Sequence, residues 1–105
     1  MTTHDKIHEQ VTSNPVVLYM KGSPAFPQCG FSSAAVQMLK ACGVDRFVSV
    51  DVLANPDIRQ GIKEYANWPT IPQLYINGEF VGGSDIMREM YQSGELQKVL
   101  ETAKA

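Results

Sequence analysis

A cysteine stands where a predicted strand leads into a predicted helix. Residues 16–20 form an unbroken apolar run and a helical pattern begins at Phe31, so Cys29 lies just ahead of a helix N-terminus. Unpaired backbone N–H groups and the helix dipole favour negative charge there, which lowers the pKa of a thiol. Lys21 adds a second positive influence. We therefore predict a reactive or metal-ligating Cys29, rather than a cysteine that only packs as a small apolar side chain.

The spacing from Cys29 to Ser32 is that of a Cys-x-x-Cys redox pair in which a hydroxyl replaces the second sulfur. A hydroxyl cannot close a disulfide, so the chemistry of this segment must use one protein sulfur. The other cysteine, Cys42, lies thirteen residues further along the predicted helix, or roughly 20 Å at the helical rise. A disulfide needs Cα atoms within about 7 Å. Because Cys42 falls on the apolar stripe of that helix, we predict that it packs in the core.

Two later segments each allow two interpretations. Thr70-Ile71-Pro72 follows a Trp-Pro break, and its proline either begins a strand in the ordinary trans form or follows a cis peptide bond. Ser84-Asp85 either only caps a helix or also, behind the Gly82-Gly83 turn, forms an anion site at the helix N-terminus. Lys21 and Arg59 are ambiguous in the same way, because most cationic side chains are merely solvated.

The rest of the chain supplies the elements that would hold these residues. In the first half of the chain, the patterns predict a helix over 4–13, a strand over 16–20, a helix over 31–42 and a strand over 47–52. A helix from Pro56, capped by Asn55, follows, and then a hairpin of 74–76 and 79–81 around Asn77-Gly78. The chain ends with a helix from near Ile86, capped by Ser84-Asp85, and, after Ser93-Gly94, a helix from 95 to about Lys104. A strand–helix–strand unit is parallel with a right-handed crossover, whereas a hairpin is antiparallel. We therefore predict one α/β domain over residues 1–105, with a four-stranded mixed sheet flanked by helices.

Composition limits the function classes. The chain has 105 residues, 44% of them hydrophobic, which suits one core without a disulfide framework. The net charge is −2 and no basic run is present, so nucleic acid is not an expected partner. No apolar stretch approaches the roughly 20 residues needed to cross a bilayer, and residues 1–10 show no signal-peptide or transit-peptide pattern. We expect a cytoplasmic protein with no membrane partner.

Taken together, these segments resemble the monothiol glutaredoxins that carry a Cys-Gly-Phe-Ser signature. The matching pieces span about residues 16–100, and they are Lys21-Gly22-Ser23-Pro24, Pro27-Gln28-Cys29-Gly30-Phe31-Ser32, Trp68-Pro69-Thr70-Ile71-Pro72-Gln73-Leu74, Asn77-Gly78-Glu79 and Gly82-Gly83-Ser84-Asp85-Ile86. The resemblance implies a thioredoxin-like fold, with a cis Pro72 beside Cys29. One position departs from part of the family: Ser84 stands where some members carry a second cysteine, so no resolving sulfur is available there.

The resemblance also implies two ligands, glutathione and a [2Fe–2S] cluster. Cys29 would bind iron and lie beside the glutathione sulfur. The other residues implied in glutathione binding are Lys21 and Arg59 at the glycine-end carboxylate, Thr70, Ile71 and Pro72 along the peptide, and Gly83, Ser84 and Asp85 at the other carboxylate and the amine. These assignments suit the chemistry, because Arg binds a carboxylate through two parallel hydrogen bonds.

Three functions compete for these residues. The first is an iron–sulfur cluster carrier, the second is a glutathione-dependent oxidoreductase that acts on mixed disulfides through Cys29, and the third is an inert docking module. The docking module does not explain the glutathione-binding residues, and the resemblance favours the carrier, with at most weak oxidoreductase activity.

Counting sulfurs predicts how the cluster would be held. A [2Fe–2S] cluster usually takes four thiolate ligands, and each chain offers only Cys29. Two chains with one glutathione each would supply four, which predicts a cluster-bridged homodimer. The resemblance further suggests a BolA-type partner and apo iron–sulfur proteins as clients.

Overall fold

The structure, a computed structural model, describes residues 1–103. Its elements follow the predicted order: α1 (Thr3–Ser13), β1 (Val16–Met20), α2 (Gly30–Ala41), β2 (Val48–Asp51), α3 (Pro56–Ala66), β3 (Gln73–Ile76), β4 (Glu79–Gly82), α4 (Ser84–Ser93) and α5 (Glu95–Thr102). The expected end of the last helix near Lys104 lies outside the described residues. Among the described helices, none is both long enough and apolar enough to cross a membrane.

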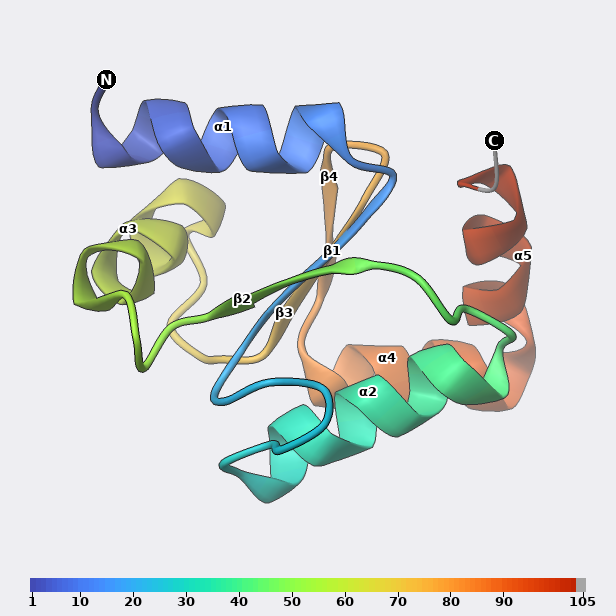
Figure 1. The fold of residues 1–105 in the computed structure, drawn as a ribbon. Helices are drawn as coiled ribbons and strands as arrows, with labels where there is room; N and C mark the ends of the chain where they lie inside the picture. The colour runs from blue at the N-terminus through green and yellow to red at the C-terminus, as the bar shows by residue number, and fades with distance from the viewer. Residues whose placement is uncertain (104–105) are drawn as a thin grey trace.

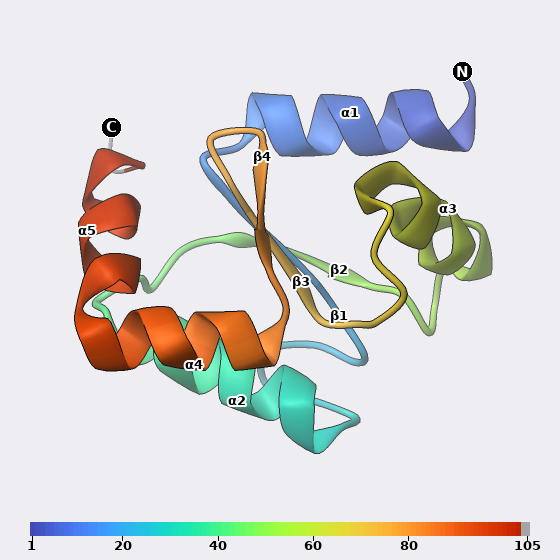
Figure 2. The same cartoon turned by 180° about the vertical axis from the view of Figure 1, so that it is seen from behind.

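The four strands form one mixed sheet in the order β2-β1-β3-β4. Strand β1 pairs in parallel with β2 and antiparallel with β3, and β3 pairs antiparallel with β4. Helices α1 and α3 lie on one face of the sheet, and α2 and α4 lie together on the other (Figure 1). The view from behind shows the same two helical layers with the strands between them (Figure 2). This is the α/β architecture that the sequence predicted.

Strand β1 is buried on both faces, which explains its unbroken apolar sequence. Val17 and Tyr19 point into the core beneath α1 and α3. The alternate residues Val16, Leu18 and Met20 point into the core beneath α2, α4 and α5. The strand therefore ends at a fixed position between two packed layers, and the loop that carries Cys29 begins directly after it.

The turn between β3 and β4 forms as its sequence predicts. Asn77 and Gly78 both have positive φ, 53° and 83°, as a two-residue hairpin turn requires. At α3, Asn55 is the predicted N-cap residue with Pro56 following, but its side chain makes no capping hydrogen bond. The Asn55 amide donates instead to the carbonyl of Asp51, at 2.9 Å.

The start of α4 differs from its prediction. The N-cap residue is Gly83, and Ser84 is already the first residue of the helix, with no side-chain capping bond. The expectation that Ser84 and Asp85 cap a helix starting near Ile86 is therefore wrong. The physical reason lies in the two glycines before it: Gly82 has a φ of +153°, which other residues rarely adopt, and Gly83 is extended, so these two residues make the transition from β4 into the helix. The backbone consequently reaches helical geometry about two residues earlier than a side-chain cap would place it.

Candidate functional site

Cys29 is the N-cap residue of α2. Its backbone is extended, with φ −154° and ψ 153°, and its sulfur accepts a hydrogen bond from the backbone N–H of Ser32 at 3.3 Å. The side chain is half-buried. The predicted position of Cys29 at a helix N-terminus is confirmed, and the sulfur takes the place of the oxygen that usually caps a helix.

Ser32 links this sulfur to the end of β1. The Ser32 side chain is buried, and its Oγ accepts a hydrogen bond from the backbone N–H of Lys21 at 3.1 Å. The same Oγ lies 3.5 Å from the sulfur of Cys29. Because Lys21 N–H donates to the oxygen, the hydroxyl hydrogen is free to donate to a thiolate at Cys29. From the sequence, Ser32 was assigned no role beyond the absence of a second sulfur.

The two cysteines have opposite pKa shifts. Partial burial raises the pKa of Cys29, but hydrogen bonds from the Ser32 side chain and from the N–H groups of Ser32 and Phe31, with the charge of Lys21, outweigh it. The pKa of Cys29 is therefore lowered from its ordinary value of 9.0. Burial raises the pKa of Cys42, which lies in the core beneath α2 as predicted. Only Cys29 is favoured as a thiolate, the nucleophilic and metal-ligating form.

The loop that carries Cys29 is tied to the sheet at its base. The N–H of Gly22 donates to Oδ1 of Asp51 at 3.0 Å, and the N–H of Gln28 donates to the carbonyl of Lys21 at 2.9 Å. The loop and the first turn of α2 nonetheless expose two large aromatic side chains, Phe26 at 74% and Phe31 at 61%. Hydrogen bonds thus hold the loop in place around Cys29. The side chains of Phe26 and Phe31, which lie before and after Cys29 in the sequence, are exposed to solvent.

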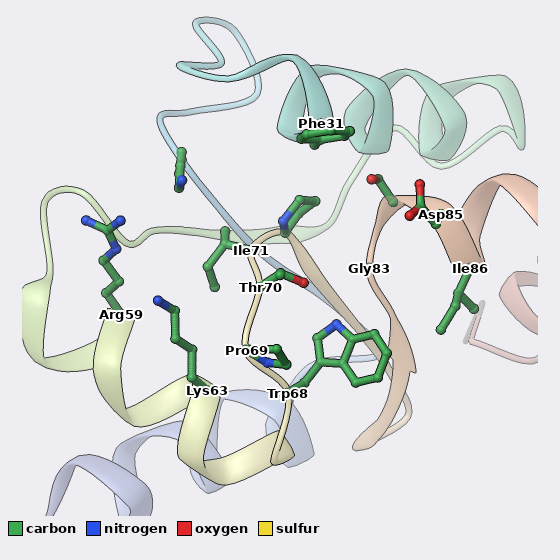
Figure 3. A pocket seen from close by; sticks show the side chains of 13 residues that line it. Phe31, Arg59, Lys63, Trp68, Pro69, Thr70, Ile71, Gly83, Asp85 and Ile86 are labelled. Atoms are coloured by element: carbon green, nitrogen blue, oxygen red, sulfur yellow. The ribbon is translucent and has the colours of Figure 1, made fainter.

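A groove of about 380 Å³ opens beside the start of α2. Five parts of the chain line it: the residue after β1, the first turn of α2, one side of α3, the segment 68–72, and the start of α4 (Figure 3). The lining residues are Lys21, Phe31, Arg59, Lys63, Trp68, Pro69, Thr70, Ile71, Pro72, Gly83, Ser84, Asp85 and Ile86. Its size falls within the range of small-molecule sites, which is about 300–1,000 Å³.

The structure brings most of the predicted site residues to this groove. Eight of the nine line it, and the ninth, Cys29, lies two residues before the lining residue Phe31. The peptide bond between Ile71 and Pro72 is cis, which answers the question that the sequence left open. The part of each residue in binding glutathione stays a prediction.

Charge is distributed unevenly along the groove. Arg59 and Lys63, one turn apart on α3, direct their side chains to one end of it (Figure 3), and Lys21 adds a third cation to the lining. Asp85 lies at the other end, in the first turn of α4, beyond Thr70 and Ile71 (Figure 3). The groove therefore suits an elongated molecule with a carboxylate at one end and an amine at the other.

Five lining residues were not among the predicted site residues: Phe31, Lys63, Trp68, Pro69 and Ile86. Lys63 stands four residues after Arg59, and residues at this spacing share one face of a helix, so the spacing could have identified it. Trp68 and Phe31 gave no such signal, because an aromatic side chain beside a turn is commonly part of the core.

Metal-ligating side chains do not cluster in the described part of the chain. Within residues 1–103, no three His, Cys, Asp or Glu side chains are grouped so that they could hold a metal ion.

A family match and two similar proteins all identify this chain with the glutaredoxins. Residues 16–81 match the glutaredoxin family. Glutaredoxin 4 of Escherichia coli K12 is 59% identical over 104 residues, which cover 99% of this chain and 90% of that protein. An uncharacterized monothiol glutaredoxin of Synechocystis is 60% identical over 103 residues, or 98% of this chain and 95% of that protein.

A solved structure agrees with the sequence match. The solution structure of reduced apo GrxS14 from poplar superimposes with a TM-score of 0.82 and 56% sequence identity, covering 94% of this chain and 90% of that one. The thioredoxin-like fold expected from the sequence is thereby confirmed.

Proposed function

This chain belongs to the glutaredoxin family, and from that premise we propose that it binds glutathione in the groove and carries a [2Fe–2S] cluster through Cys29. The observation that carries the proposal is the groove itself. It joins three cations, a carboxylate and an irregular backbone segment next to a thiol whose pKa is lowered.

Glutathione matches the distribution of charge in the groove. Its glycine-end carboxylate suits Arg59 and Lys63 with Lys21 nearby, since Arg can bind a carboxylate through two parallel hydrogen bonds. Its other carboxylate suits the backbone N–H groups at the start of α4, where the helix dipole favours an anion. Its amine suits the side chain of Asp85. The backbone at Thr70 and Ile71 lies between these two ends and suits the middle of the peptide (Figure 3).

The cluster would be carried as cargo, and the chemistry of Cys29 suits the role of a cluster ligand. Iron–sulfur clusters are held by thiolates, and Cys29 is the cysteine whose pKa is lowered and whose side chain reaches the surface. One chain and one glutathione offer two sulfurs, so two chains and two glutathiones complete four. We therefore propose a homodimer bridged by one cluster, with transfer to apo iron–sulfur proteins and a BolA-type partner. A free thiolate suits a reducing compartment such as the cytoplasm.

Anaerobic reconstitution with iron, sulfide and glutathione tests this function. The protein should turn brown, bind two irons per two chains, and elute as a dimer in size-exclusion chromatography. Cys29→Ser should lose both the cluster and the dimer. The matched variant Cys42→Ala should keep both, because Cys42 packs in the core. A cluster held by a single chain, or one retained by Cys29→Ser, would contradict the ligand count.

A second function is favoured by the same lowered pKa of Cys29. The thiolate can attack the glutathione sulfur of a mixed disulfide, which releases the client thiolate and leaves Cys29 disulfide-bonded to glutathione. A second glutathione thiolate then attacks that disulfide, releasing oxidised glutathione and restoring Cys29. No second protein sulfur is needed. Rapid turnover of a glutathionylated peptide by protein that stays colourless after reconstitution would make this the main activity.

A further inference from the structure

Residues 68–72 form one wall of the groove, and their irregular backbone depends on hydrogen bonds from other parts of the chain. Pro69 and Pro72 have no backbone N–H to donate, so this short segment has few hydrogen bonds to make on its own. Its first residue is anchored to α3, because the N–H of Trp68 donates to the carbonyl of Lys63 at 3.0 Å. Trp68, Pro69 and Thr70 are exposed, so a hydrogen bond from within the protein is needed to hold their carbonyl groups in one orientation.

Gln73 supplies that partner from beneath the wall. Its side chain is fully buried, an unusual position for an amide in the first residue of β3. Nε2 donates one hydrogen bond to the carbonyl of Trp68 and one to the carbonyl of Thr70, each at 3.2 Å. Both amide hydrogens are therefore used, and they hold the carbonyl groups of two residues of the wall, Trp68 and Thr70.

The orientation of the Gln73 amide is itself fixed. Its Oε1 accepts a hydrogen bond from the hydroxyl of Tyr75 at 3.2 Å. The ring of Tyr75 is held among three others, with centroids 5.7 Å from Tyr19, 6.1 Å from Tyr65 and 5.4 Å from Phe80. The amide therefore cannot turn its oxygen toward the wall without placing two carbonyl oxygens against it and losing the Tyr75 bond. Consistent with this, no buried side-chain nitrogen or oxygen of the described residues lacks a partner.

We propose that Gln73 is a positioning residue of the groove: its two donors hold the carbonyl groups of Trp68 and Thr70 so that the backbone of Thr70 and the adjoining Ile71 is presented to the bound peptide. An apolar side chain of similar length would fill the same volume, so packing alone does not require an amide here. What an apolar side chain cannot supply is the pair of donors. The expected effect of Gln73 on glutathione affinity rests on the proposed function. Its expected effect on the order of residues 68–72 does not.

The test replaces Gln73 with Met, which keeps the length of the side chain and removes both donors. Glutathione binding to the reduced protein, measured by calorimetry, should weaken roughly tenfold, the equivalent of about 1.4 kcal/mol. The pKa of Cys29, measured from the pH dependence of its alkylation, should not change, because Gln73 makes no contact with the hydrogen bonds around the sulfur. Tyr75→Phe removes only the bond that orients the amide, so its effect on affinity should be smaller than that of Gln73→Met.

A control separates positioning from general stability. Leu100→Ala truncates a buried side chain of α5, in the core on the other face of the sheet. It should lower the free energy of unfolding without weakening glutathione binding under conditions where the protein stays folded. If Gln73→Met and Leu100→Ala weaken binding to the same degree, Gln73 acts only through stability and the proposal is overturned.

A readout without ligand keeps this inference distinct from the proposed function. Trp68 is the only tryptophan of the chain, so quenching of its fluorescence by acrylamide reports on the wall directly. Quenching should increase in Gln73→Met, and to a smaller degree in Tyr75→Phe, but not in Leu100→Ala. If the unaltered protein binds no glutathione, the proposed function fails, while the quenching result still decides the role of Gln73. Unchanged quenching in both Gln73→Met and Tyr75→Phe would overturn that role, and if Gln73→Met does not fold, Tyr75→Phe alone decides it.

Discussion

Cys29 and Cys42 are the N-cap and the C-cap residues of the same helix, α2. At the N-cap, N–H groups surround the sulfur and the pKa of the thiol is lowered. At the C-cap, the side chain enters the core and burial raises the pKa. The helix thus favours the thiolate at Cys29 and disfavours it at Cys42. The two thiols should therefore change the folding stability in opposite directions as the pH rises.

The first prediction concerns that pH dependence. Because the pKa of Cys29 is lower in the folded chain than its ordinary 9.0, the unfolded chain binds the proton more tightly, and the free energy of unfolding should rise as the pH increases toward that value. Cys42 should oppose this above its ordinary pKa, because burial disfavours its thiolate. Denaturant unfolding of the reduced protein and of Cys29→Ser isolates the Cys29 effect: the difference in stability should grow with pH. A difference that is flat between neutral pH and the ordinary thiol pKa would contradict it.

The second prediction concerns the hydroxyl of Ser32. Ser32→Ala removes the side-chain donor to the thiolate but keeps the backbone N–H at 3.3 Å, so the pKa of Cys29 should rise toward its ordinary value. The pH dependence of thiolate absorbance measures this shift. Ser33→Ala is the matched control, because the Ser33 hydroxyl accepts from the side chain of Gln37 and does not contact the sulfur. Equal shifts in the two variants would show that helix propensity, not the hydrogen bond, is responsible.

The third prediction concerns the cationic end of the groove. Arg59→Ala should weaken glutathione binding by roughly tenfold, as expected for the loss of a two-bond contact to a carboxylate, with little change in the free energy of unfolding because Arg59 is exposed. Arg46→Ala removes the same charge from an exposed position that does not line this groove. Calorimetric titration of both variants should therefore show a loss only in the first. A similar loss in both would indicate a general effect of net charge.

The fourth prediction concerns the turn into α4. Gly82 has φ +153°, and a Cβ there would lie 2.7 Å from Cβ of Ile86. Gly82→Ala should therefore destabilise the protein by roughly 1–3 kcal/mol for backbone strain, with a further loss from crowding. Gly94→Ala also places alanine at positive φ, +85°, but its Cβ meets nothing within 4 Å, so the loss should be smaller, roughly 1–2 kcal/mol. Thermal unfolding of the two variants compares them directly.

Much of this fold could be predicted because its local signals agree with one another. The apolar run at Val16–Met20, the Asn77-Gly78 turn and the Asn55-Pro56 start of α3 each predict their element from a few adjacent residues. The start of α4 was predicted incorrectly, because a Ser-Asp pair resembles a side-chain cap and the sequence does not show that Gly82 and Gly83 complete the turn first.

The site was less predictable where a role depends on burial. Ser32 and Gln73 are polar residues that the chain buries completely, and their functions follow from the partners they meet in three dimensions. Lys21 N–H, which donates to Ser32, is eleven residues away in sequence, and no local pattern connects the two. Charged residues such as Arg59 were easier to select, because their chemistry is evident from their type alone.

The exposed aromatic side chains beside Cys29 belong to a long stretch without charge. From Gly22 to Leu39 the chain contains no Asp, Glu, Lys, Arg or His, while the groove next to it carries three cations. Dissolved salt screens exposed charges, with a Debye length of about 8 Å at physiological ionic strength. Added salt should therefore weaken the binding of glutathione, whereas the proposed cluster-bridged dimer, if its two chains meet at this uncharged stretch, should be nearly unaffected once the cluster has formed. The two steps of assembly would then respond differently to the ionic strength of the solution.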